Sequence, residues 1–284
     1  MTRIGFAGLA ALAVLATAPV ARAQGTDADH WNWRGVLARG KTLEIRGIAG
    51  SIRAEVATGA QVEVSAVKRG PAGDRADVHI VMEQGADGVT ICAVYGDGGN
   101  CRHGRSHSHA DDNDASVDFV ARVPAGVAFQ GAMVSGDVEV SGLSAEVDAN
   151  SVSGDVAVRN VHGDVTARSV SGRATLDGVD GQRVDGNSVS GDVAFTGPVQ
   201  AGGRYVFRSV SGDLTLRVDG TFNAEVSLTT VSGEIESDFP ITLGSGGRFG
   251  RRNLDFTVGT GGARVELGTV SGDFHLRRGA QPAR

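Results

Sequence analysis

The chain has 284 residues, with 27 lysines and arginines against 33 aspartates and glutamates, so its formal net charge is -6. This balance argues against a nucleic-acid-binding protein, because affinity for phosphate depends on clustered positive charge. The 43 glycines and the aromatic content of 5% argue against an aromatic-rich helical core, while 40% hydrophobic residues are enough to predict a folded chain.

Residues 1–23 have the pattern of a secretory signal peptide. Arg3 provides a short positive region, an apolar run follows, and Ala21-Arg22-Ala23 suits cleavage by a signal peptidase. The alternative, a membrane anchor, needs about 20 apolar residues, whereas Pro19 and Arg22 interrupt this run. We therefore expect an exported protein, periplasmic or extracellular, whose mature chain has no transmembrane segment.

Residues 24–133 are interpreted as an N-terminal β region. Runs such as TLEIRG, SIRAEVA and QVEVSAVKR alternate apolar and polar residues and are separated by glycine, proline and aspartate, which is typical of strands and turns. Trp31 and Trp33 would share one face of a strand, where they either hold a ligand or, as we expect, cover one end of a sheet. Stacked β-repeats need protected ends, so this region is expected to be a cap.

Cys92 and Cys101 lie nine residues apart in this region. In an oxidising compartment an isolated pair predicts a disulfide rather than a catalytic or metal site. Two free thiols are the alternative.

A polar stretch at residues 96–114 is rich in histidine and aspartate. Its composition resembles a short metal-binding tract, with the candidate ligands His103, His107, His109, Asp111 and Asp112. No spacing among them matches a known zinc pattern. We expect a surface loop tethered by the disulfide, at which any metal binds weakly.

A repeated Val-Ser-Gly-Asp sequence organises residues 134–278, leaving residues 279–284 as a tail. The repeats start at Val134, Val152, Val170, Val189, Val210, Val231 and Val270, with Arg or Glu in place of Asp after Val170 and Val231. Their steps are 18, 18, 19, 21, 21 and 39 residues, and FGRRNLDF at Phe249 aligns as a degenerate copy within the last step. In the first repeats apolar residues also recur every nine positions, as in Val134, Leu143 and Val152.

Between the repeated corners the sequence alternates with period two, which predicts short strands. Strands that recur every 18 to 21 residues predict stacked coils, none of which buries its apolar face alone. The predicted fold is therefore all-β: a β-solenoid of 18 to 21 residue coils with an N-terminal β-sheet capping region.

Stacking these coils aligns a column of acidic residues, Asp137, Asp155, Asp192, Asp213, Glu234 and Asp273. Carboxylates about 4.8 Å apart repel one another, and Arg173 and Arg252 interrupt the column. We expect each carboxylate to close its own turn by local backbone hydrogen bonds. One alternative is a calcium-dependent β-roll, although the doubled glycines of the calcium nonapeptide are missing. The other is a catalytic cluster, which needs groups in unlike environments.

Several segments together resemble the bacterial putative-adhesin family, a domain of unknown function made of β-strand repeats. They are KTLEIRGIAGSIRAEVATGAQVEVSAVKRG, VARVPAGVAFQGAMVSGDVEVSGL, the repeated NSVSGDV and RSVSGDL, and FGRRNLDFTVGTGGARVELGTVSGDFHLRR. The resemblance covers about residues 33–278. It implies a β-solenoid-like protein of the cell envelope or outside the cell, with no catalytic residues and no cofactor.

Two classes of function are consistent with these features. We expect a non-enzymatic structural or interaction protein of the cell envelope, whose partner is another envelope protein, a glycan or a surface. The alternative is a carbohydrate-active enzyme on a β-helix, for which fold analogy is the only argument. The sequence places no cluster of unlike titratable groups at one position, so the non-enzymatic interpretation is favoured.

Overall fold

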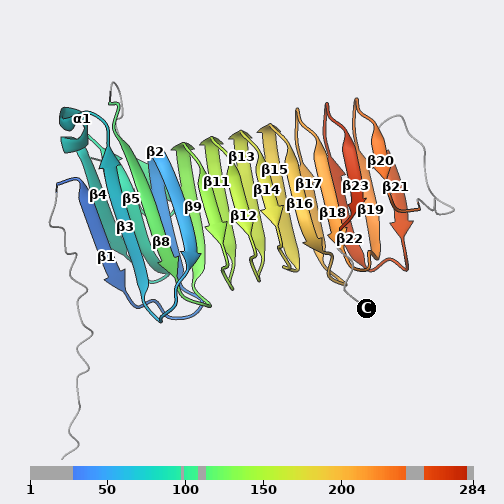
Figure 1. Cartoon of the computed structure of the whole chain (residues 1–284), viewed down its shortest axis with the longest axis horizontal. Helices are drawn as coiled ribbons and strands as arrows, with labels where there is room; N and C mark the ends of the chain where they lie inside the picture. Colours follow the sequence, from blue (N-terminus) through green and yellow to red (C-terminus); the bar gives the residue numbers. More distant parts are fainter. Residues whose placement is uncertain (1–27, 97–98, 108–112, 241–252, 280–284) are drawn as a thin grey trace, which may run out of the picture.

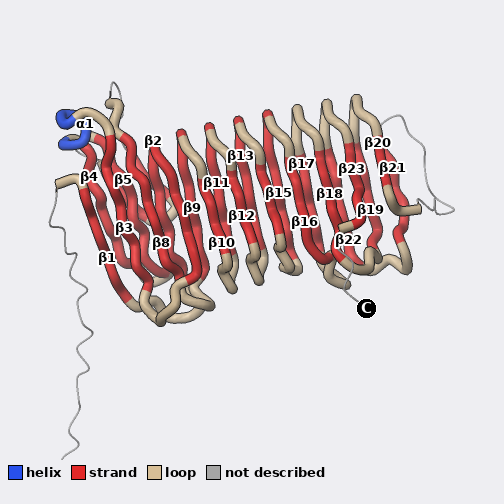
Figure 2. Tube along the Cα trace, in the orientation of Figure 1, coloured by secondary structure: helices blue, strands red, loops and turns tan. Residues whose placement is uncertain are grey.

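The computed structural model describes residues 28–96, 99–107, 113–240 and 253–279, and nearly all of its regular structure is β-strand (Figures 1 and 2). The only helix in these ranges, α1 (Ala72–Ala76), is five residues long. The all-β prediction is thus confirmed. The expected signal peptide lies outside the described residues.

The strands form two sheets, called here sheet A and sheet B, with the core between them. Sheet B contains, in spatial order, β4 (Val78–Gln84), β5 (Gly88–Tyr95), the first half of β2 (Thr42–Val56), β9 (Ala128–Ser135), β11 (Val147–Ser153), β13 (Val165–Ser171), β15 (Arg183–Ser190), β17 (Arg204–Arg208), β22 (Ala263–Gly268), β19 (Ala224–Thr229) and β21 (Asn253–Val258).

Sheet A contains, in spatial order, β1 (His30–Gly35), β3 (Val62–Arg69), β8 (Ser116–Val123), the second half of β2, β10 (Val138–Ser141), β12 (Val156–Arg159), β14 (Ala174–Asp177), β16 (Val193–Pro198), β18 (Leu214–Asp219), β23 (Phe274–Arg278) and β20 (Ile235–Ser237). A separate hairpin is formed by β6 (Asn100–Arg102) and β7 (Arg105–His107).

Each coil of the stack consists of one strand in sheet B, a Val-Ser-Gly corner and one strand in sheet A. Successive coils pair in parallel and in register, so that Val147 lies beside Val165 and Val156 beside Ala174. In most strands of the stack alternate residues point into the core, and their buried apolar side chains form one continuous cluster along the stack. The repeat of 18 to 21 residues therefore sets the coil length, and the solenoid prediction is confirmed.

The corner glycines allow neighbouring coils to approach closely. A Cβ atom on Gly136, whose φ is 139°, would lie 1.7 Å from the carbonyl oxygen of Gly50 in the preceding coil. Gly50 occupies the same corner in β2, where the strand passes from sheet B to sheet A. The stack therefore begins at β2, well before the first Val-Ser-Gly-Asp.

Antiparallel strands cover the N-terminal end of the stack. In sheet A, β1 is the terminal strand and pairs with β3. Trp33 on β1 is 3% exposed, and Trp31 packs against the same core. The tryptophans thus cover an end of the sheet, as expected. The domain boundary between residues 133 and 134 stays a prediction, and β9 runs through it.

At the C-terminal end the spatial order of the coils differs from their order in the sequence. The terminal coil, β22 with β23, lies between the β17–β18 coil and the β19–β20 coil. Figure 1 shows β22 and β23 among strands that precede them in the chain. The degenerate copy at Phe249 does not add a coil between the Val231 and Val270 corners, which are direct neighbours. Its residues 253–256 belong to β21, which pairs antiparallel with β19, and its residues 249–252 lie outside the described residues.

Candidate functional site

The acidic column joins successive coils. The backbone N–H of Asp155 donates to Oδ1 of Asp137 at 2.8 Å, and the N–H of Asp213 donates to Oδ1 of Asp192 at 3.1 Å. In the same way, Asp273 donates to Asp213 and Glu234 donates to Asp273, both at 2.8 Å. These carboxylates therefore bond to the next coil, and the expectation that each one closes its own turn is wrong.

These contacts explain how closely stacked carboxylates are tolerated. Each accepting carboxylate faces an N–H donor, which offsets repulsion between neighbouring acids. Arg173 interrupts the column, and its Nη2 lies 3.5 Å from Oδ2 of Asp192. Arg252 lies outside the described residues. Within the described part of the chain no three His, Cys, Asp or Glu side chains converge as a metal-binding group.

A second ladder runs inside the same corner. At five of the seven repeat corners, the buried residue before the exposed valine donates its hydroxyl to a glycine carbonyl of the preceding coil, at 2.8 to 2.9 Å for the serines and 3.3 Å for Thr269; the donors are Ser151, Ser169, Ser188, Ser209 and Thr269. Met133 precedes Val134, and the hydroxyl of Thr230, which precedes Val231, has no hydrogen-bond partner among the described residues. A buried hydroxyl without a partner is costly. This ladder therefore contributes to holding the coils in register.

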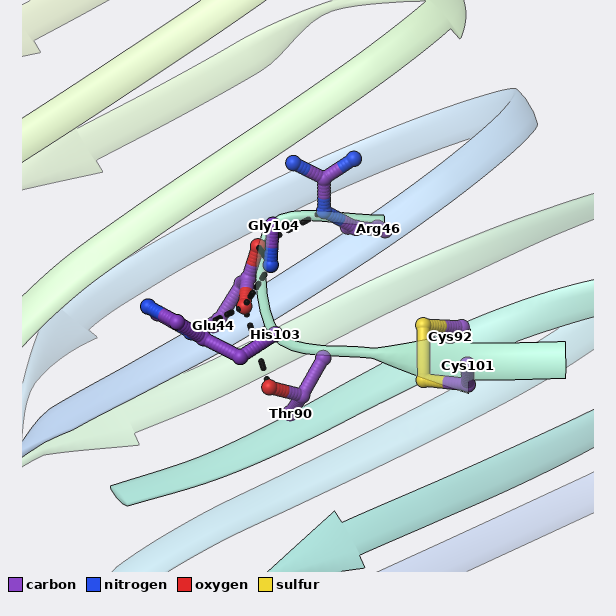
Figure 3. The surroundings of a disulfide bond; sticks show 7 residues. All are labelled: Glu44, Arg46, Thr90, Cys92, Cys101, His103 and Gly104. Atoms are coloured by element: carbon purple, nitrogen blue, oxygen red, sulfur yellow. Dashed lines mark hydrogen bonds and ion pairs between the residues drawn. A yellow bond between two sulfur atoms is a disulfide. The ribbon is translucent and has the colours of Figure 1, made fainter. Parts of the chain in front are cut away.

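The disulfide fastens the β6–β7 hairpin to sheet B (Figure 3). Cys92 on β5 is bonded to Cys101 on β6, and both side chains are buried. Val94 and Val81 pack against this pair. The hairpin therefore covers apolar side chains on the outer face of sheet B.

A buried carboxylate makes a second attachment for the hairpin (Figure 3). Glu44 on β2 exposes 3% of its side chain and accepts hydrogen bonds from Nε of Arg46 at 2.6 Å and from Oγ1 of Thr90 at 3.0 Å. From the hairpin, the N–H of Gly104 lies 3.2 Å from each carboxylate oxygen, and Nδ1 of His103 lies 2.7 Å from Oε2.

These contacts set the charge state of Glu44. Burial by itself raises the pKa of the Glu44 carboxyl, but the hydrogen bonds from Arg46, Gly104 and Thr90 outweigh it, so that the pKa lies below its usual value. The carboxylate is therefore ionised when it binds the hairpin. Glu44 is an anchor for the hairpin, since it joins His103 and Gly104 to β2 and to Thr90 on β5.

Of the candidate metal ligands, His103 contacts Glu44. For His107 the structure describes only the backbone, which pairs with Asn100. His109, Asp111 and Asp112 lie outside the described residues. Metal binding by this stretch stays a prediction.

The valines of the repeat form a ladder of exposed apolar side chains along one corner of the stack. Their exposed fractions are 43 to 51%, and in spatial order they are Val134, Val152, Val170, Val189, Val210, Val270 and Val231. The corresponding residues at the opposite corner, Leu143, Val161 and Val179, are buried. The two corners, nine residues apart, are thus not equivalent.

A groove of about 490 Å³ runs beside the first part of this valine ladder. Val134, Val152, Val170 and Val189 line it, together with Met133, Arg46, Arg168, Asn150 and Asn187. The polar groups are turned toward neighbouring acids: the Asn150 amide donates to Asp148 at 2.7 Å, and Arg168 lies 3.6 Å from the same carboxylate. Arg46 connects the groove to the Glu44 anchor.

Sequence reasoning missed both the valine ladder and Glu44. Strand parity could have found the ladder, because Val147, Ala149 and Ser151 point inward and Val152 must therefore point outward. No comparable pattern identifies Glu44. It occupies an outward position of β2, and it is buried by a hairpin about 60 residues further along the chain.

No helix among the described residues is long and apolar enough to span a bilayer.

Three solved structures are similar to the chain. A putative cell adhesion protein from Clostridium sporogenes has 8% identity and a TM-score of 0.36, over 87% of this chain and 99% of that one. A putative adhesin from Bacteroides fragilis has 13% identity and a TM-score of 0.44, over 88% and 98%. A putative adhesin from Parabacteroides distasonis has 10% identity and a TM-score of 0.29, over 87% and 98%. No curated protein matches the chain.

The family comparison gives a more direct result. The model of the Toastrack DUF4097 family matches residues 128–277, which are 150 of the 284 residues. The match begins at β9 and ends in β23, so it contains all the Val-Ser-Gly corners. It confirms the resemblance drawn from the repeats, and the chain belongs to the Toastrack DUF4097 family.

Proposed function

We propose that this protein is exported to the cell envelope and acts there as a non-enzymatic interaction protein, whose binding surface is the valine ladder and its groove. The observation that carries the proposal is the regular exposure of seven valines at one corner, where they contribute little to the core. A contiguous apolar strip on a folded protein is a feature of interaction surfaces.

The geometry favours a partner that is extended along the stack. Parallel coils place equivalent side chains about 4.8 Å apart, so one strip of valines can contact a long partner continuously. Amide and guanidinium groups of Asn150, Asn187 and Arg168 line the same groove. The surface therefore combines an apolar strip with polar groups that are paired with Asp148 and Asp185, a combination suited to an envelope protein or a glycan.

Two features support export. Residues 1–23 have the composition of a signal peptide, and the Cys92–Cys101 disulfide is of a kind that persists in oxidising compartments.

Co-sedimentation of the mature chain with purified peptidoglycan sacculi and with outer-membrane vesicles tests the proposal. The double variant Val152→Ser/Val170→Ser removes apolar groups from the groove and is expected to bind about tenfold more weakly, because burial of each lost methyl group contributes to affinity. Val56→Ser is the matched control, since Val56 is 47% exposed but lies outside the ladder.

Binding by the double variant that equals that of the unmodified chain would contradict the proposed surface. If the chain binds neither the sacculi nor the outer-membrane vesicles, the envelope role is contradicted. Release of soluble sugar fragments from the sacculi would contradict the non-enzymatic role.

A further inference from the structure

The terminal coil fills a slot between two coils that precede it in the chain. On one side, the N–H of Gly212 donates to the carbonyl of Ser271 at 3.1 Å. On the other side, the N–H of Gly272 donates to the carbonyl of Ser232, also at 3.1 Å. Without the terminal coil, the facing edges of the β17–β18 coil and the β19–β20 coil lack these partners.

The C-terminal segment, defined here as residues 253–279, also reaches around the β19–β20 coil. Strand β21 pairs antiparallel with one edge of β19, and β22 pairs parallel with the other edge. A connection of four residues, 259–262, joins β21 to β22, a length that commonly joins two directly paired strands. Here it crosses the end of β19, where the N–H of Thr260 donates to Oδ1 of Asn223 at 3.1 Å.

The β19–β20 coil therefore depends on the C-terminal segment for its place in the stack. Among the described strands, β19 pairs with β21 and β22, and β20 pairs with β23. The segment is a clamp that links this coil to the rest of the molecule.

Ion pairs join side chains of the C-terminal segment to the coils on both sides of the slot. Glu266 on β22 lies 2.9 Å from Arg204 and 3.3 Å from Arg208 in the β17–β18 coil. On the opposite side, Arg277 lies 3.3 Å from Asp238, which follows β20. All these pairs join the segment to earlier parts of the chain, so a segment from another molecule would form the same pairs.

The covalent route to the slot is long. Strand β20 ends at Ser237 and β21 begins at Asn253, so 15 residues connect them, which span about 50 Å when fully extended. This connection is the covalent link between the segment and the strands that precede it.

We propose that two copies of this chain associate by exchanging their C-terminal segments, so that residues 253–279 of one copy fill the slot of the other. The exchanged form keeps the strand pairs and ion pairs of the single chain, and exchange of an identical element is a low-cost route to dimers. Until β22 and β23 pair, the strand edges that border the slot are unpaired, and unpaired edges accept a segment from either source. This proposal does not depend on the proposed function.

Cross-linking of mixed full-length chains tests the exchange. Thr215 on β18 and His275 on β23 lie side by side in register, and the described chain has no free cysteine. A Thr215→Cys chain and a His275→Cys chain are unfolded, mixed and refolded at about pH 6, where thiols react slowly with the native disulfide. A short bis-maleimide then links adjacent thiols.

We expect a linked heterodimer whose ratio to monomer falls about tenfold when the refolding mixture is diluted tenfold, because exchange is bimolecular. The matched control mixes Ala194→Cys with Thr215→Cys chains. These residues are also neighbours in register, on β16 and β18, but neither belongs to the exchanged segment. This control is expected to give no linked heterodimer above the level of random collision.

Equal yields in the two mixtures, or no heterodimer in either, would overturn the proposal. A single chain that carries both Thr215→Cys and His275→Cys must form an internal cross-link at high dilution, which checks that the substituted strands still pair. Should that check fail, Arg217 and Arg277 provide a second register pair, tested as Arg217→Cys and Arg277→Cys with the same two criteria.

Discussion

Gly191 shows how one residue limits the approach of two coils. A Cβ atom at this position would lie 2.2 Å from the carbonyl oxygen of Gly172 and 2.7 Å from its carbonyl carbon. Both are backbone atoms of the preceding coil, so a side chain cannot be accommodated by a change of rotamer. The spacing of the coils must increase instead, at the expense of the hydrogen bonds on either side.

Gly191→Ala is therefore expected to lower the free energy of unfolding by about 1 to 3 kcal/mol, the usual cost of forcing extra atoms into a packed site. Urea denaturation of the mature chain measures this difference. Gly59→Ala is the control, because a Cβ atom there meets nothing within 4 Å. Equal unfolding midpoints for the two variants would refute the close-contact explanation.

Glu44 makes the attachment of the hairpin dependent on pH. Its pKa is lower in the folded chain than its ordinary value, because the hydrogen bonds to its carboxylate outweigh the effect of burial. A lowered folded pKa contributes stability above the unfolded pKa of about 4.3, and this contribution is lost as the pH falls through the folded pKa.

Glu44→Gln is accordingly expected to lower stability at pH 7 by about 1 to 3 kcal/mol, since buried donors lose a charged acceptor. The difference from the unmodified chain should shrink below about pH 4. Thermal melts across pH measure both effects. Glu63→Gln, which disrupts a more exposed pair with Arg34 at 3.3 Å, should change stability by less than about 1 kcal/mol. A Glu44→Gln effect that persists unchanged at low pH would contradict this account.

At the scale of the structural element, most repeat corners of the solenoid carry two sets of hydrogen bonds. The aspartates bond to backbone N–H groups of the next coil, and the buried hydroxyls bond to glycine carbonyls of the preceding coil. Both sets join neighbouring coils, so the Ser-Val-Ser-Gly-Asp sequence acts mainly between coils rather than within a turn.

Calcium is expected to have little effect on this corner, because the Oδ1 atoms of Asp137, Asp155 and Asp213 already accept backbone donors. The melting temperature in millimolar calcium should differ from that in EDTA by less than about 2 °C. A change of about 1 kcal/mol in the free energy of unfolding would move the melting temperature by about 2 to 4 °C. A ligand at a hundredfold excess over its Kd would add about 2.7 kcal/mol. A shift above about 8 °C would favour the calcium-dependent β-roll.

At the scale of the whole molecule, stability is expected to be distributed along the stack. Each coil contacts mainly its neighbours, so a local defect should loosen nearby coils first. Because the terminal coil is inserted, β19 lies beside β22, a strand that follows it by about 40 residues. A defect in the terminal coil should therefore loosen β19, although the two are distant in sequence.

Phe274→Ala tests this distribution, since Phe274 on β23 is fully buried. The cavity should cost about 3 to 5 kcal/mol and increase hydrogen exchange in β19 and β20 as well as in β22 and β23. Hydrogen-exchange mass spectrometry measures each strand separately. Phe129→Ala, at an equally buried site on β9, should instead affect β2 and β11. Equal loss of protection along the whole stack in both variants would show that the solenoid unfolds as one unit.

The amino-acid sequence by itself determined the local features of this protein. The period-two alternation predicts the strands, the recurring Val-Ser-Gly predicts the corners and the coil length, and Cys92 with Cys101 predicts the disulfide. These features depend on neighbouring residues or on a regular period, so they can be recognised without knowledge of the fold. The repeats also identify the family.

Only the tertiary structure decided which coils are neighbours and which polar groups are buried. Val210, Val231 and Val270 begin nearly identical corners, so the local sequence does not distinguish one stacking order from another. The order is defined by strand pairings distant in sequence, such as β17 with β22 and β20 with β23. Glu44 is buried for the same kind of reason, because a hairpin from another part of the chain covers it.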